Sequence, residues 1–116
     1  MRVNNKNLLY NKFQGDKGFI YFLEFPDSVK VGFSKDWERR VNKQIQGGTV
    51  LMIISGPTKD LADLEFDTMI KFQNYTRLNT AGNRYTEYID KSQKQKVWKY
   101  LREAVSKNTN LIIIPT

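Results

Sequence analysis

A tyrosine, a lysine and an arginine lie within one short segment where ordinary packing residues would serve. The segment GFIYFLEFPDSVKVGFSKDWERRV, residues 18–41, contains Tyr21, Lys30 and Arg40. A phenol has a reference pKa of ~10, and a neighbouring ammonium group favours its ionised form. A guanidinium can bind a phosphate group through two hydrogen bonds. These residue types are therefore suited to a site for a phosphate.

A hairpin is predicted to position the tyrosine and the lysine. Two runs rich in β-forming residues flank Pro26-Asp27, which is typical of a turn. If these two residues are the central pair of the turn, Tyr21 faces Gly32, and Lys30 is its diagonal neighbour on the same face. Gly32, which has no side chain, then leaves space above the phenol ring. The alternative interpretation is that Tyr21 is a core aromatic residue whose hydroxyl group reaches the surface.

Helical phase predicts the position of Arg40. Trp37, Val41 and Ile45 recur every four residues and mark the buried stripe of a helix. At 100° per residue, Arg39 falls about 160° from the centre of this stripe and Arg40 about 100° from it. We expect Arg39 to face water and Arg40 to flank the sheet. Arg40 is then either a surface residue that lies along apolar neighbours or a ligand of a phosphate.

One carboxylate falls on the apolar face of a second predicted helix. The face is marked by Leu61, Leu64, Met69 and Phe72. Glu65 is expected near the centre of this face, where a charge is costly unless it is paired or binds a cation. Glu65 is therefore either a structural ion-pair partner, with Arg40 or Lys30 as candidates, or a ligand for a cation.

The rest of the pattern predicts one small α/β domain. Strands are expected over 19–25, 29–33, 49–54, 84–89 and 111–115. A first helix is expected over about 36–46, and a second from Thr58 or Asp60 to about residue 72. A third helix is expected to follow a capping box formed by Asp90 and Gln93 and to end near residue 107. This order suggests a mostly antiparallel sheet of about three core strands that is flanked by helices. Residues 1–17 are expected to form an N-terminal arm, and residues 18–116 a single domain.

The composition narrows the classes of function. The chain has 116 residues, no cysteine and no histidine, which excludes disulfides and catalytic sites that need either residue. A formal charge of +7 and a pI near 9.7 favour a nucleic-acid partner. No segment has the apolar length of a membrane span or of a signal peptide. We expect a cytoplasmic protein that binds no membrane.

The residues described above resemble the core of the GIY-YIG nucleases. Phe19-Ile20-Tyr21 corresponds to the first motif of that family, and Lys30-Val31-Gly32 to the second. Arg40, eight residues after Gly32, matches the catalytic arginine, and Glu65 matches the metal-binding glutamate. The stretch RYTEYI, 84–89, resembles a closing motif of the phage-related branch. The chain departs from the family pattern at Phe19, Lys30 and Gln44, where glycine, tyrosine and, in some members, histidine are found.

The resemblance implies a metal-dependent endonuclease that hydrolyses phosphodiester bonds of DNA, most often double-stranded. Tyr21 is the implied base for the attacking water, and Lys30 favours its phenolate or itself orients the water. Arg40 stabilises the charge at phosphorus, and Glu65 holds Mg²⁺ or Mn²⁺. The implied products carry 5′-phosphate and 3′-hydroxyl ends.

The basic residues expected to bind nucleic acid are Lys35, Arg39, Lys43 and Arg84. Because one domain leaves no second unit to read bases, we expect either low intrinsic sequence specificity or a protein partner or homodimer that supplies it. If the source is a phage, the compartment is the host cytoplasm. Two alternatives stay open: a catalytically inactive nucleic-acid-binding module, and a small phage-type inhibitor of a host protein, which would expose an apolar patch.

Overall fold

The computed structural model describes residues 17–43, 47–77 and 88–115, without the side chains of Lys43 and Arg77. Residues 1–16 of the expected N-terminal arm and residues 84–87 of the RYTEYI stretch lie outside these residues, whereas Lys17, expected in the arm, begins the first strand. The elements are β1 (Lys17–Glu24), β2 (Ser28–Ser34), α2 (Trp37–Lys43), β3 (Thr49–Pro57), α3 (Thr58–Lys71), β4 (Thr76–Arg77), β5 (Tyr88–Asp90), α4 (Lys94–Lys107) and β6 (Ile112–Ile114). Short 3₁₀ turns, Gln73–Tyr75 and Lys91–Gln93, precede β4 and α4. None of the described helices is long and apolar enough to cross a membrane.

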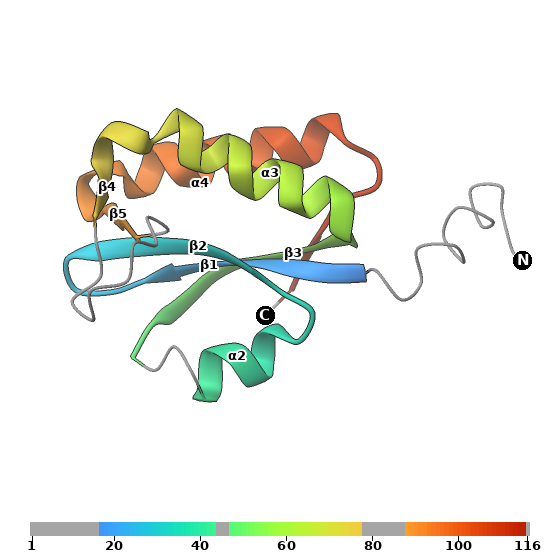
Figure 1. The fold of residues 1–116 in the computed structure, drawn as a ribbon, viewed down its shortest axis with the longest axis horizontal. Coiled ribbons are helices and arrows are strands. Elements are labelled where there is room, and N and C mark those ends of the chain that lie inside the picture. Colours follow the sequence, from blue (N-terminus) through green and yellow to red (C-terminus); the bar gives the residue numbers. More distant parts are fainter. Residues whose placement is uncertain (1–16, 44–46, 78–87, 116) are drawn as a thin grey trace, which may run out of the picture.

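The described strands form one antiparallel sheet in the order β4-β5-β2-β1-β3-β6. Helices α3 and α4 cover one face of it, and α2 lies on the other face (Figure 1). The α/β class and the antiparallel pairing are confirmed. The expected three core strands are too few, because five strands of three or more residues and the two-residue β4 join the sheet.

The β1–β2 hairpin has the predicted register. Tyr21 pairs with Gly32, and Leu23 pairs with Lys30. The turn is closed by a hydrogen bond of 2.8 Å that the backbone N–H of Phe25 donates to the carbonyl of Ser28. Because side chains alternate along a strand, Tyr21 and Lys30 lie on the same face of the sheet.

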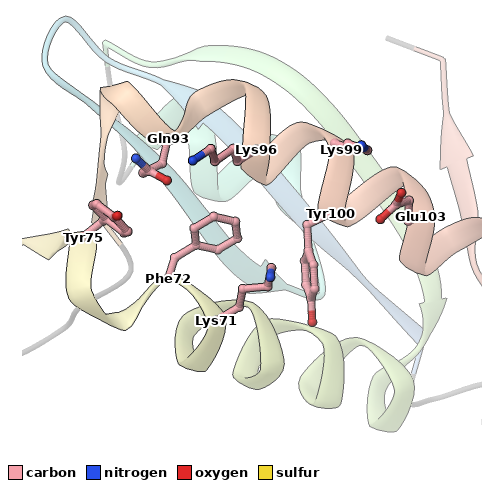
Figure 2. Close-up of a pocket in the computed structure, with 8 residues that line it drawn as sticks. All are labelled: Lys71, Phe72, Tyr75, Gln93, Lys96, Lys99, Tyr100 and Glu103. Carbon is pink, nitrogen blue, oxygen red and sulfur yellow. The ribbon is translucent and has the colours of Figure 1, made fainter.

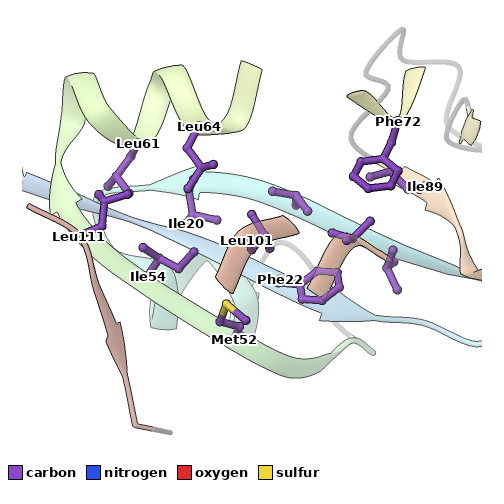
Figure 3. Packing of buried hydrophobic residues seen from close by; sticks show 13 residues of the cluster. Ile20, Phe22, Met52, Ile54, Leu61, Leu64, Phe72, Ile89, Leu101 and Leu111 are labelled. Carbon is purple, nitrogen blue, oxygen red and sulfur yellow. The ribbon is translucent and has the colours of Figure 1, made fainter. Parts of the chain in front are cut away.

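The larger core lies between the sheet and the two helices α3 and α4 (Figure 3). Its central strand residues are Ile20, Phe22 and Ile54, and all three are fully buried. The ring of Trp98 on α4 packs against Phe22 with centroids 6.4 Å apart. Burial of this apolar surface on one face of the sheet is the main stabilising contribution to the fold.

The smaller core lies on the opposite face, under α2. Val41 of this helix packs with Tyr21, Leu23 and Ile53, and Trp37 is half-buried beside them. The predicted stripe of α2 is confirmed at Trp37 and Val41, whereas Ile45 lies outside the described residues. This packing fixes α2 on the face that carries Tyr21.

Aspartate side chains accept hydrogen bonds from backbone N–H groups at the start of α2 and of the 3₁₀ turn that leads into α4. Asp36 precedes α2, and its carboxylate accepts a bond of 3.2 Å from the N–H of Arg39. Asp90 instead caps the 3₁₀ turn before α4, since its carboxylate accepts from the N–H of Ser92 at 2.9 Å. The expected capping box is therefore wrong in detail: the amide of Gln93 donates to the Ser92 hydroxyl.

Two lysines join the end of β1 to the region around the start of α4. Lys94 and Lys91 form ion pairs with Glu24 at 2.9 and 3.0 Å. The hydrogen bonds from Lys94 and then Lys91 hold the pKa of the Glu24 carboxyl below its ordinary value. A second contact at this end is the hydrogen bond of 3.3 Å that Lys91 donates to the carbonyl of Pro26.

Candidate functional site

The phenol of Tyr21 lies directly over Gly32 on the neighbouring strand. A β-carbon built on Gly32 would collide with the hydroxyl end of this phenol. Tyr21 is fully buried, so its ring has little room to move aside. The sequence prediction of open space above the ring at Gly32 is wrong, because the hydroxyl end of the ring itself fills the place beside Gly32.

Replacing Gly32 with alanine is expected to cost about 1–3 kcal/mol of stability, because the new methyl group overpacks this contact. Urea unfolding of the wild type and of Gly32→Ala measures the loss. The same substitution in a Tyr21→Ala background should cost much less, since the smaller side chain removes the collision. An equal cost in both backgrounds would contradict the contact.

Lys30 is a buried lysine on the same face as Tyr21. Its relative exposure is 6%, and its ammonium nitrogen lies 4.6 Å from the centroid of the Tyr88 ring. Tyr88 is its partner on β5. A cation over an aromatic face is attracted to the ring, and this attraction helps to offset the cost of burial. The Lys30 ammonium thus lies on the face of the sheet that also carries Tyr21. Its contact with Tyr88 was not predicted from the sequence.

Arg40 lines a shallow pocket of about 270 Å³ at the junction of β2 and α2. The other described lining residues are Ser34, Lys35, Asp36 and Arg39. Arg40 is half-buried, as expected, and its Nε–H is buried without a hydrogen-bond acceptor among the described residues. Three cations against one carboxylate make this pocket favourable for an anion.

The other residues expected to bind nucleic acid are placed only in part. Lys35 and Arg39 are exposed and line the Arg40 pocket. The side chain of Lys43 and the whole of Arg84 lie outside the described residues. Ser34 and Asp36, which precede α2, also line the pocket. The two residues of this set whose side chains are described therefore lie around the start of α2.

Glu65 does not lie at the centre of the buried face of α3. That centre is formed by Leu61, Leu64 and Thr68, whereas Glu65 is half-buried. The prediction was wrong because it overlooked Thr68, whose hydroxyl donates a bond of 2.6 Å to the carbonyl of Leu64 and so is satisfied inside the core.

Glu65 lies on the flank of α3 that points away from α4. Asp60 accepts hydrogen bonds from Asn108 and Asn110, and Lys71 lies over the Tyr100 ring, so these two residues mark the flank next to α4. At 100° per residue, Glu65 falls about 140° from Asp60 and about 120° from Lys71. Glu65 therefore belongs to the layer opposite α2, and it is not part of the Arg40 pocket.

The donor set for a divalent cation is sparse. Within residues 17–43, 47–77 and 88–115, no three Asp, Glu, His or Cys side chains are grouped as a metal site. Mg²⁺ commonly keeps several waters and binds through one or two carboxylates together with substrate phosphates. A metal held by Glu65 alone would need a phosphate to complete its site, and Glu65 does not line the Arg40 pocket.

Comparison with protein families, with curated proteins and with solved structures finds no match to this chain.

Proposed function

We propose that this chain is a metal-dependent endonuclease that hydrolyses phosphodiester bonds of DNA. The observation that supports the proposal is that the tyrosine, the lysine and the helix that bears the arginine lie on one face of the sheet. Tyr21 and Lys30 share this face in the confirmed hairpin register, and α2, which bears Arg40, packs on it. The resemblance to GIY-YIG nucleases, which rests on the same residues, supports this proposal.

In this proposal the Arg40 pocket binds the phosphate to be cut. Arg40 donates to the phosphate oxygens, while Lys35 and Arg39 attract the flanking backbone. A guanidinium held at this place stabilises the negative charge that grows at phosphorus in the transition state.

Tyr21 is the proposed base. Its phenolate, favoured by the Lys30 ammonium on the same face, takes a proton from water as the water oxygen attacks phosphorus. The bond from phosphorus to the 3′ oxygen breaks, and solvent protonates this leaving oxygen, which gives 5′-phosphate and 3′-hydroxyl ends. Glu65 is the proposed ligand for Mg²⁺ or Mn²⁺, a metal that would supply stabilisation of charge on the leaving oxygen. Because Glu65 lies in the layer opposite α2, this assignment rests on the family resemblance and not on the Arg40 pocket. An alternative role for Lys30 is to orient the water itself.

One observation favours a module that binds nucleic acid without cutting it. Tyr21 is fully buried and Lys30 is 6% exposed, so both lie below the surface on which a phosphate would sit. Such a module would use the Arg40 pocket and the +7 charge without the chemistry. The two functions share binding and differ only in cleavage.

Another observation favours the inhibitor alternative. Phe66 and Ile70 lie one turn apart on α3 and are 65% and 50% exposed. Apolar side chains of this size on a helix surface can contact a partner protein. An inhibitor of this kind would bind protein with no dependence on DNA, so failure to bind DNA would leave this alternative standing.

Nicking of supercoiled plasmid, with Mg²⁺ or with EDTA, tests the proposal, and filter binding to duplex DNA accompanies it. We expect nicking that needs the metal, and duplex affinity that falls steeply between ~50 and ~200 mM salt, because phosphate binding releases counterions. Binding without nicking would support the inactive module. An absence of duplex binding even at low salt would remove both nucleic-acid functions.

A further inference from the structure

A second pocket, of about 400 Å³, opens on the other layer of the molecule. It lies between the C-terminal end of α3 and the helix α4 (Figure 2). Its described lining residues are Lys71, Phe72, Tyr75, Gln93, Lys96, Lys99, Tyr100 and Glu103. Because α3 and α4 cover the face of the sheet opposite α2, this pocket is separate from the Arg40 pocket.

The charges around this pocket select an anion. Lys96 and Lys99 are exposed on α4, and Lys71 comes from the last turn of α3. Glu103 is the one carboxylate that lines the described part of the pocket. Three ammonium groups against one carboxylate give an excess of positive charge, which attracts phosphate.

The walls of the pocket offer aromatic rings. Phe72 is buried at the base and meets Tyr100 edge to face, with centroids 6.0 Å apart and an angle of 87° between the rings. Tyr75 is 45% exposed and carries a large accessible ring. Burial, and secondarily the charge of Asp67, raises the pKa of Tyr100, so its phenol stays uncharged and does not repel an anion.

A buried amide completes the set of groups. The side chain of Gln93 is 7% exposed, and its amide nitrogen donates a hydrogen bond of 3.3 Å to the Ser92 hydroxyl. An amide carries a carbonyl acceptor as well as its donors, and it can pair with the edge of a nucleic-acid base. The pocket therefore combines cations, rings and an amide within one cavity.

We propose that this pocket binds an unpaired nucleotide of a nucleic-acid strand. The lysines would contact the phosphate, and the base would stack on the exposed ring of Tyr75. A simple anion would use the lysines but not the rings, and an apolar ligand would use the rings but not the lysines. The proposal does not depend on cleavage at the Arg40 pocket, because its groups come from α3, α4 and the turns beside them.

Fluorescence anisotropy with a labelled ten-residue oligothymidylate at ~50 mM salt tests this pocket. Tyr75→Ala should weaken binding about tenfold, since stacking on an aromatic ring supplies affinity for each base. The double variant Lys96→Glu/Lys99→Glu should weaken it at least as much. Lys59→Glu/Lys107→Glu is the matched control, because it makes the same charge change on exposed residues outside the pocket. Circular dichroism checks that each variant is folded.

The comparison between variants decides the outcome. Binding lost equally in the pocket variant and in its charge-matched control would overturn the site, because net charge alone would then explain it. A loss in Tyr75→Ala that is equal for the oligothymidylate and for a blunt duplex would also overturn it, because a duplex presents no unpaired base. Plasmid nicking plays no part in this readout, so the test gives its answer whether or not the chain cleaves DNA.

Discussion

Arg40→Ala is expected to lower the rate of plasmid nicking by about 10²–10³-fold, the typical cost of removing one donor aimed at transition-state charge. Binding of duplex DNA should weaken far less, because Lys35 and Arg39 remain at the same pocket. A catalytic arginine should lose far more nicking rate than duplex affinity when it is replaced. An arginine that only attracts DNA should lose both to a similar extent. Single-turnover nicking with protein in excess over plasmid measures the first effect, and filter binding measures the second.

Arg39→Ala is the matched control, since Arg39 is the exposed neighbour on the same helix. It removes the same charge but should slow nicking by only about threefold or less. Arg40→Lys should stay well below wild type, because an ammonium group keeps the charge but lacks the planar pair of donors. Equal losses in Arg40→Ala and Arg39→Ala would show that Arg40 contributes only charge, and would contradict its catalytic role.

Glu65→Ala is expected to abolish nicking while duplex binding stays at or slightly above the wild-type level, because the proposed metal ligand is lost, the cations of the Arg40 pocket remain and the net charge becomes more positive. If Glu65 serves as the metal ligand, stability should change little or rise. If it instead neutralises an internal cation, its loss strands that cation at a cost of about 3–5 kcal/mol. The two roles of Glu65 therefore change stability in opposite directions.

Thermal melts of wild type and Glu65→Ala, with and without Mg²⁺, distinguish these roles. Mg²⁺ should raise the melting temperature of the wild type but not of the variant, because a ligand that binds only the folded state stabilises it. Glu65→Gln is the conservative control, since it keeps the shape of the side chain and removes the charge. A large loss of melting temperature with nicking retained would end the assignment of Glu65 to the metal.

The hairpin could be predicted from the sequence because the information that sets it is local. Pro26-Asp27 fixes the turn, and the alternation of side chains then fixes which residues share a face with Tyr21. The phase of α2 is local for the same reason, and the half-buried Arg40 and exposed Arg39 agree with it. This half of the candidate site required no knowledge of distant contacts.

The positions that could not be predicted depend on packing between distant segments. Thr68 has a polar side chain, yet it is fully buried because the Leu64 carbonyl of the same helix accepts a hydrogen bond from its hydroxyl. The centre of the buried face of α3 therefore lies away from Glu65. The two residues of β4 are too few to show a strand pattern in the sequence, and they form a strand because they pair with β5. The α3–α4 pocket went unpredicted because Lys71 and Lys96 are brought together only when the two helices pack.

The proposed catalytic groups differ in how far apart they lie along the chain. Tyr21, Lys30 and Arg40 belong to one continuous unit, the β1–β2 hairpin and the helix that follows it. Closing so short a loop costs little entropy, and contacts between near neighbours in sequence form quickly during folding. Glu65 reaches its position only after β3 has paired with β1 and α3 has packed on the sheet. If the proposed function holds, we therefore expect the groups proposed to bind phosphate to take their places early in folding, and Glu65, on the other side of the sheet, to take its place in a later step.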